Sequence, residues 1–384
     1  MFDILKQIWI FFLSNQTASA LTFFSFLFAI FVWLLSIFQS RKKAKRQDIK
    51  QQVIHLSQKK QAENQDKQIQ IQQKLLCDTR FSFGIELLGN QNESTRIGGA
   101  YHLYSLANEY PDEYLNPVCE IFCAHIRTIT NGKNYQENYK EKPSNEIQTI
   151  IDLLFKKNKD SNLIFDDCKK KLNNTFLNGI DFGNTTLNNV DFENVRISKV
   201  SFSYAKLNNV VFLFAKLNNV QITSTVLNDI NFSFTVLNDI SFGNAKLNDI
   251  YFEYSSLTDV DFKIAKLSNV YFSDISAYDT CPETILRNIN FQDATLYNVY
   301  FNNDYLILDD SNFRNATLTN VYFNDANLSD VDFENAKLTN VDFSNAGLFG
   351  VSFTKTVLSR YGSKVIDRKG CSIELTKPKE ENTE

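Results

Sequence analysis

The chain has 384 residues, enough for more than one domain, and a formal net charge of −4. The charge is unevenly distributed, because residues 1–171 carry 23 Lys and Arg against 18 Asp and Glu, whereas residues 172–360 carry 12 against 21. The six cysteines have no regular spacing, which argues against a secreted disulfide scaffold and favours a reducing compartment.

Near the N-terminus, residues 20–38 form an apolar run without a charged side chain. A helix of this length spans the hydrocarbon core of a bilayer, which is about 30 Å thick. Residues 41–46 then hold five Lys and Arg side chains, so the positive-inside rule places the following chain in the cytoplasm. We predict that residues 1–40 contain a single transmembrane helix, that the protein lies in the bacterial inner membrane, and that its C-terminal domains are cytoplasmic.

Two other interpretations of this run are a cleaved signal peptide and a buried helix. The tripeptide at 18–20, Ala-Ser-Ala, resembles a cleavage site, but a second spanning segment would still follow it. A buried helix of a soluble domain seldom lacks a polar face entirely. Residues 41–77 are basic and rich in glutamine, and we expect a solvated juxtamembrane helix there.

Residues 78–160 show helical periodicity and predict a small all-helical module. A helix is expected to start at Pro111, and another to follow Ser144, which is a suitable N-cap. Cys119, Cys123 and His125 are the one cluster in this segment with the character of metal ligands. Because no second ligand pair lies nearby, we expect buried helix cysteines and no metal.

From Leu177 to Leu358 an apolar Leu, Ile or Phe recurs every five residues, with one break after Phe272 and another near residue 303. Two residues before each of these centres is a small or β-branched side chain. A five-residue period makes no stripe on an α-helix and alternates faces on a straight strand. It suits a solenoid whose chain turns a corner at every repeat, so that all centres point toward one axis.

The repeat resembles the pentapeptide-repeat proteins, as in ANLSDVDFENAKLTNVDFSNAGLFG at 326–350. The resemblance implies a right-handed, four-sided β-helix in residues 161–360, with the central residue of each repeat and the residue two before it facing inward. The preceding segment resembles the helical module of membrane-anchored bacterial members, through Phe81, Leu88, Gly89, Arg96, Ile97, Gly98, Gly99, Ala100, Tyr101, Leu103, CAHIR (123–127) and IQTIIDLLFKK (147–157). The predicted fold class is therefore mainly β, preceded by a transmembrane helix and a small all-α module.

The centres alternate between Leu and Phe, so each side of the coil is expected to carry one residue type throughout, with Phe rings stacked in columns. Ile197 replaces a Leu and Ile222 replaces a Phe. The alternation continues correctly across both breaks, which predicts loops near 273–285 and 302–305, with Leu308 as a centre. The helical module is expected to cover the first coil, and residues 361–384 to form a C-terminal cap and tail.

The repeat region lacks histidine and any recognisable catalytic constellation, so we expect no enzymatic activity and no cofactor. Outward positions stacked every twenty residues form a candidate acidic strip, with its counterpart on the opposite corner. It consists of Asp229, Asp239, Asp249 and Asp259. A solvated set of turn residues is the simpler interpretation, and a surface that imitates the phosphate backbone of DNA is the functional one.

A second candidate surface is apolar. In the pentapeptide frame it points outward and comprises Val211, Leu213, Phe214, Phe234, Tyr251, Tyr254 and Tyr271. A continuous row of this kind is larger than the isolated apolar residues found on most protein surfaces. It indicates either an internal packing face, covered by the helical module or by the 273–285 loop, or a site that binds a protein partner or a second copy of the chain.

These features predict a non-enzymatic, membrane-anchored scaffold that presents a β-helix to an unknown protein partner in the cytoplasm, without direct nucleic-acid binding. The alternative is a DNA-mimicking modulator of DNA gyrase or of another DNA-binding protein, which the resemblance to gyrase-binding members implies. Delivery into a host cell is a more remote alternative that rests on analogy.

Overall fold

A computed structural model describes residues 20–158, 161–273, 284–302 and 306–358, together with residues 3, 6, 7 and 10. The chain divides into two compact units, residues 1–78 and 79–384. The predicted cap and tail at 361–384, most of the predicted loop at 273–285 and the insertion at 303–305 lie outside the described residues.

Helix α2 (Ala20–Leu88) contains the uncharged run and the basic segment that follows it. Within the described residues, it is the one helix long and apolar enough to cross a membrane. Its apolar side chains are exposed, Phe24 and Phe28 among them, which argues against a buried core helix. A signal sequence meets the same criterion of length and composition, so the membrane anchor stays a prediction.

The helical module contains α3 (Glu93–Glu109), α4 (Pro111–Thr130), α5 (Lys133–Asn138) and α6 (Asn145–Phe155). As the sequence predicts, Pro111 lies in the first turn of α4, and the Ser144 hydroxyl accepts a hydrogen bond from the backbone N–H of Ile147 at 3.3 Å. The apolar faces of α3, α4 and α6 meet in a small core that includes Leu103, Leu106, Val118, Phe122, Ile126, Ile147, Ile150 and Ile151.

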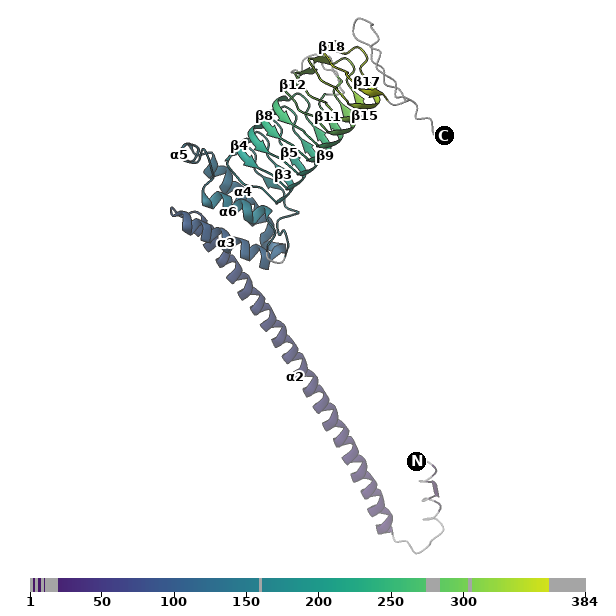
Figure 1. Cartoon of the computed structure of the whole chain (residues 1–384). Coiled ribbons are helices and arrows are strands. Elements are labelled where there is room, and N and C mark those ends of the chain that lie inside the picture. Colours follow the sequence, from purple (N-terminus) through teal and green to yellow (C-terminus); the bar gives the residue numbers. More distant parts are fainter. Residues whose placement is uncertain are drawn as a thin grey trace. The chain divides into compact units, whose positions relative to one another are not determined.

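Residues 170–358 form a parallel β-solenoid with two long sheets (Figure 1). One sheet contains β1 (Lys170–Lys171), β3 (Thr186–Asp191), β5 (Lys206–Val211), β7 (Val226–Asn231), β9 (Lys246–Tyr251), β11 (Lys266–Tyr271), β13 (Thr295–Tyr300), β15 (Thr317–Tyr322), β17 (Lys337–Asp342) and β19 (Val357–Leu358). The other contains β2 (Phe176–Asn178), β4 (Arg196–Ser201), β6 (Lys216–Gln221), β8 (Val236–Ser241), β10 (Ser256–Asp261), β12 (Thr284–Arg287), β14 (Leu306–Asp309), β16 (Asn327–Ser329) and β18 (Gly347–Phe349).

Neighbouring strands are twenty residues apart in register, as in the pairing of Leu207 with Leu227. The register continues across the two insertions, where Leu286 pairs with Leu257 and Leu308 pairs with Leu286. Leu306 and Leu308 are both buried, as the alternation of centres predicts. The core therefore keeps its register on both sides of each insertion.

The core of the solenoid consists of Leu columns and Phe columns, as predicted. Rings within one Phe column stack nearly parallel, with centroids 4.8 Å apart for Phe242 and Phe262. Rings from the two Phe columns meet edge to face, for example Phe252 and Phe262 at 6.2 Å and 83°. Ile197 and Ile222, which replace a Leu and a Phe, are also buried.

Nearly every fifth residue lies at a corner of the coil with a positive φ, and most of these residues are Asn or Asp. Their short polar side chains tolerate the left-handed conformation better than other residues with a Cβ atom. Eight described corners instead carry Lys199, Tyr204, Phe214, Ser224, Phe234, Tyr254, Ile264 or Lys355. A left-handed conformation costs such residues about 1–2 kcal/mol, so a corner aromatic requires a separate explanation.

The helical module covers the first coil of the solenoid, as predicted, and α4 and α6 lie at that end in Figure 1. The rings of Phe155 in α6 and Phe182 in the first coil are 5.8 Å apart. The side chain of Lys170 is buried there and donates hydrogen bonds to the carbonyl oxygens of Asp166 and Asn188 at 2.9 and 3.0 Å. The first backbone edge is thereby protected.

Gly179 provides a test of this junction. It has a φ of 62°, and a Cβ atom there would lie 2.2 Å from the carbonyl oxygen of Glu141. Gly179→Asn is expected to destabilise the full-length protein by about 1–3 kcal/mol, measured by urea unfolding in detergent, even though Asn suits other corners. Asn219→Gly, the change in the reverse direction at the same corner two coils on, should cost less than about 1 kcal/mol. Equal losses would contradict the steric explanation.

Candidate functional site

One side of the solenoid presents outward aromatic and aliphatic side chains over six coils, and we call it the aromatic face. It lies outside the core column that contains Phe212, Phe232 and Phe252. It comprises Val211, Leu213, Phe214, Phe234, Tyr251, Tyr254, Tyr271, Tyr300 and Tyr322.

The first part of the aromatic face is a stack at one corner of the coil. The ring centroids of Phe214 and Phe234 are 5.2 Å apart, and those of Phe234 and Tyr254 are 4.8 Å apart. Phe214 is 49% exposed and Phe234 is 37% exposed, while Val211, Leu213 and Tyr254 are half-buried. All three rings of the stack belong to residues with positive φ.

The second part is a ladder of four tyrosines near the opposite edge of the same side. The centroid distances are 5.2 Å from Tyr251 to Tyr271, 4.8 Å from Tyr271 to Tyr300 and 5.1 Å from Tyr300 to Tyr322. Burial, followed by the neighbouring phenols, raises the pKa of Tyr300. The ladder offers a row of half-buried rings with phenolic hydroxyls.

The sequence prediction includes Tyr251 and Tyr271 but not Tyr300 and Tyr322. The missed signal is the triplet Val-Tyr-Phe, which occurs at 270–272, 299–301 and 321–323. The two insertions change the spacing between these triplets, so a fixed count of twenty residues does not find them. Strand pairing restores the register, because Tyr271 pairs with Tyr300 and Tyr300 pairs with Tyr322.

The described residues that precede the two insertions lie on the side of the coil that carries the aromatic stack. Ser273 and Asn302 follow Phe272 and Phe301 as Leu213 follows Phe212. The backbone N–H of Tyr254 also donates to the hydroxyl of Thr284, the first described residue after the insertion, at 3.0 Å. The described residues next to the first insertion therefore contact the aromatic stack.

The described helices do not cover the exposed rings. The contacts between the helical module and the solenoid involve the first coils, for example Gln148 with Asp181 and Glu141 with Lys199. Phe214 and Phe234 keep their exposure in the presence of these helices. Packing against the predicted loop at 273–285 falls mainly outside the described residues.

The repeat itself assigns the family. A family model described as pentapeptide repeats matches in eight copies, at residues 171–203, 307–345 and 326–360. The described strands show the parallel coil that this five-residue repeat predicts. The solenoid belongs to the pentapeptide-repeat family. No match was found among curated protein sequences.

Several solved structures of pentapeptide-repeat proteins are similar to the solenoid. HetL from the cyanobacterium Nostoc sp. strain PCC 7120, a protein involved in the regulation of heterocyst differentiation, is 17% identical over 53% of this chain and 91% of its own, with a TM-score of 0.27. QnrB1, a plasmid-mediated fluoroquinolone resistance protein, is 17% identical over 46% and 92%, with a TM-score of 0.27. A protein of the Arabidopsis thaliana thylakoid lumen is 20% identical over 23% and 66%, with a TM-score of 0.19.

The predicted acidic strip occupies two separate corners of the pentapeptide-repeat solenoid. Asp229 and Asp249 lie on one corner, and Asp239 and Asp259 lie on the corner diagonally opposite, all exposed and all with positive φ. Asp249 accepts a hydrogen bond from the Asn269 carboxamide at 3.0 Å. These carboxylates therefore belong to the turns of the coil. The first corner carries amides beside its two aspartates, whereas the second also carries Asp310 and Asp330 in the two coils after Asn288.

The helical module contains a buried charge cluster that the sequence prediction does not include. Glu146 in α6 is buried and accepts two hydrogen bonds from the Arg96 guanidinium of α3, both at 2.7 Å, and a third contact from His125 of α4. Burial raises the pKa of Glu146, but the hydrogen bonds from His125 and Arg96 outweigh it and lower the pKa. The cluster ties three helices together.

Glu146→Gln is expected to destabilise the full-length protein by about 1–3 kcal/mol at neutral pH, because Arg96 and His125 lose their buried counter-charge. The folded-state pKa of Glu146 is lowered, so its contribution is present above the unfolded pKa and is lost as the pH falls through the folded pKa. Urea unfolding in detergent at several acidic pH values measures this. The difference between wild type and variant should shrink toward low pH, and a constant difference would contradict the assignment.

Cys119 and Cys123 are buried in the core of the module, as predicted, and His125 points to Glu146 instead of to the thiols. The buried Cys168 joins the two cysteines from outside the module. A hydrogen bond to Cys123, together with burial, raises the pKa of Cys119 to about 12. The Cys119 thiol is therefore protonated at neutral pH and packs as a small apolar group.

Proposed function

We propose that this protein is a non-enzymatic interaction scaffold, anchored in the bacterial inner membrane by the apolar part of α2, that presents its pentapeptide-repeat solenoid to the cytoplasm. The aromatic face is the proposed binding site for a protein partner. The observation that carries this proposal is the stack of Phe214, Phe234 and Tyr254, which is exposed and occupies conformations that disfavour aromatic residues.

Two physical arguments support a protein partner. Tyrosine and other aromatic residues are enriched where protein interfaces bury their central contacts. Asn or Asp at a corner position strains the backbone less than an aromatic residue does, and Asn or Asp occupies most of the corners. An aromatic residue at three successive corners of one column therefore costs stability, and burial against a partner offsets that cost.

DNA mimicry of the kind that would modulate DNA gyrase is the second candidate. Double-stranded DNA carries a negative charge about every 1.7 Å along its axis. One corner of the solenoid offers the carboxylates of Asp229 and Asp249, and the opposite corner offers those of Asp239, Asp259, Asp310 and Asp330, with at most one in each coil and therefore about 4.8 Å or more between them. This pattern of charge imitates DNA poorly. Inhibition of gyrase supercoiling by the full-length protein in detergent at micromolar concentration would favour mimicry over the scaffold.

The proposed orientation is tested by protease treatment of spheroplasts that contain the full-length protein. The solenoid should be protected in intact spheroplasts and should be digested after their lysis, because the basic segment at 41–46 is expected to stay on the cytoplasmic side. A periplasmic protein digested in the same samples controls for protease access. Digestion of the solenoid in intact spheroplasts would reverse the assignment.

A further inference from the structure

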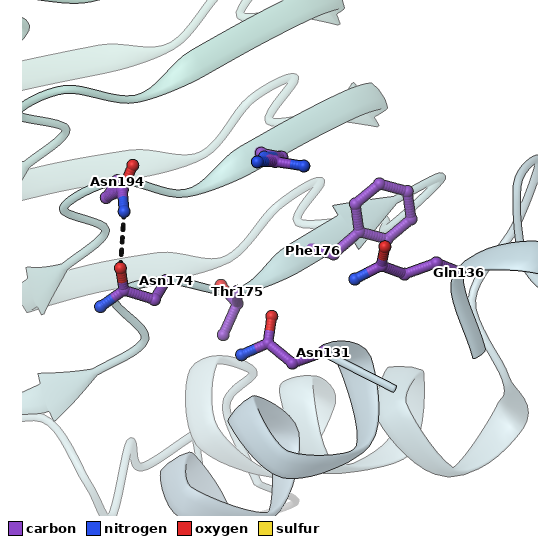
Figure 2. A pocket seen from close by; sticks show the side chains of 7 residues that line it. Asn131, Gln136, Asn174, Thr175, Phe176 and Asn194 are labelled. Carbon is purple, nitrogen blue, oxygen red and sulfur yellow. Dashed lines mark hydrogen bonds between the residues drawn. The ribbon is translucent and has the colours of Figure 1, made fainter. Parts of the chain in front are cut away.

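A cleft lies between the helical module and the first coils of the solenoid, and its Asn174 and Asn194 precede Phe214 on the corner that carries the aromatic stack. Its volume is about 320 Å³, and it is lined by Asn131, Gln136, Asn174, Thr175, Phe176, Asn194 and Arg196. Figure 2 shows Asn131 and Gln136 reaching from the module toward Thr175 and toward Phe176, the first residue of β2. The volume is at the lower end of the range for small-molecule sites.

The lining of the cleft is rich in hydrogen-bond donors. Among the described residues, no hydrogen bond or ion pair engages the Arg196 guanidinium or the Asn131 carboxamide. The Asn194 carboxamide donates to the oxygen of Asn174 at 2.6 Å, as the dashed line in Figure 2 shows, which leaves the Asn174 amide nitrogen without a described acceptor. None of the lining residues is a carboxylate. The cleft thus offers a cation and amide N–H groups without a counter-charge.

Arg196 is the first residue of β4. Its side chain is exposed, whereas that of the next residue, Ile197, is buried in the core. Its partners in register are Phe176 on one side and Lys216 on the other, so a second cation lies one coil away. A guanidinium with free N–H groups binds phosphate or carboxylate through two parallel hydrogen bonds. The carboxamides of Asn131 and Asn174 would form hydrogen bonds with other polar groups of the same ligand.

We propose that this cleft binds a small molecule that carries a phosphate or carboxylate group, with Arg196 holding the anion and Asn131 and Asn174 holding the polar remainder. This site adjoins the aromatic face, since the backbone N–H of Asn194 donates to the carbonyl oxygen of Leu213 at 2.8 Å, but the proposed ligand does not depend on the proposed partner. It would couple the junction between the helical module and the solenoid to the concentration of an anionic metabolite, because both sides of the cleft contribute donors.

Isothermal titration calorimetry of the full-length protein in non-ionic detergent tests the proposal with AMP, adenosine and glutarate as probes. AMP or glutarate should bind saturably, and adenosine, which lacks the anion, should not. Binding of AMP alone assigns a phosphate group, and binding of glutarate alone assigns a carboxylate. Absence of saturable binding by both anions at millimolar concentration, or equal binding of AMP and adenosine, would overturn the proposal.

Arg196→Gln should weaken the binding of the anionic probe about tenfold or more, because a charge-assisted hydrogen-bond pair is lost. Lys206→Gln is the matched control, since Lys206 occupies the same position of the repeat on the other sheet and does not line the cleft. It should bind the probe as the wild type does. Equal weakening in both variants would indicate unspecific attraction of the anion and would overturn the assignment to Arg196.

Discussion

Replacing Phe214, Phe234 and Tyr254 together by asparagine is expected to abolish partner binding without lowering the stability of the solenoid. The three rings form the exposed stack at the centre of the proposed site. An aromatic anchor at the centre of an interface contributes about 2 kcal/mol or more, which corresponds to about a thirtyfold change in the dissociation constant. Loss of three anchors should therefore reduce capture of the partner below detection.

Stability should be preserved because two effects oppose each other. Removing each stacked aromatic pair loses about 0.5–1.5 kcal/mol. Placing asparagine in a left-handed corner relieves about 1–2 kcal/mol at each position, and asparagine already stands at the equivalent corner residue 194. Two stacked pairs are lost while three corners are relieved, so the apparent unfolding midpoint of the full-length protein in detergent should be equal to or above that of the wild type. This separates a binding role from a packing role of the stack.

The matched control is Tyr204→Asn, because Tyr204 is also an aromatic corner residue with positive φ and is 67% exposed, but lies at another corner. Membrane pull-downs with wild type, the triple variant and the control should be compared by quantitative mass spectrometry. Partners retained by Tyr204→Asn and lost by the triple variant would support the site. If the triple variant keeps the same partners, the aromatic face is not a binding site. If the triple variant unfolds at a lower urea concentration than the wild type, the stack has a packing role instead of a binding role.

Phe262→Ala is expected to have the largest effect on stability, about 3–5 kcal/mol. The ring of Phe262 is fully buried and stacks between Phe242 and Phe291 with centroids 4.8 and 4.9 Å away. It also meets Phe252 and Phe272 edge to face, each at 6.2 Å. Truncation leaves a cavity that the coils above and below cannot fill, because their spacing is set by backbone hydrogen bonds.

Phe262→Ile is the control for this prediction, since Ile222 already occupies the same Phe column two coils earlier. A branched side chain of intermediate volume should cost less than about 1.5 kcal/mol. Urea unfolding of the full-length protein in detergent, followed by circular dichroism, measures both variants. Similar losses for Ala and Ile would show that the stacked geometry of the rings, more than the filled volume, stabilises the coil.

The repeat explains why so much of the fold was predictable. A five-residue period leaves few ways to bury every centre, and the alternation of Leu and Phe assigns each centre to a side. The same alternation identified Leu308 as a core residue across an insertion, which its pairing with Leu286 confirms. The N-cap at Ser144 followed from a local rule that needs only a hydroxyl before an amphipathic helix.

Contacts between distant segments were not predictable in this way. The ion cluster at Glu146 combines three helices, and Arg96 lies 50 residues from its partner. The sequence prediction does not extend the tyrosine ladder beyond Tyr271, because the insertions change the number of residues between equivalent positions of successive coils. The cleft at Arg196 requires the helical module to dock on the first coil, and no local pattern specifies which side chains line that junction.

The sequence by itself determined the coil, its four alternating sides, the residues of its core and the outward position of the corner stack. Periodic burial is visible in the sequence because every five-residue repeat places an apolar residue at the same position. Only the tertiary structure decided which exposed residues meet, namely the four stacked tyrosines, the three helices joined at Glu146 and the donors around the cleft. These arrangements depend on register and docking, which arise when the whole chain packs and leave no repeated signature in the sequence.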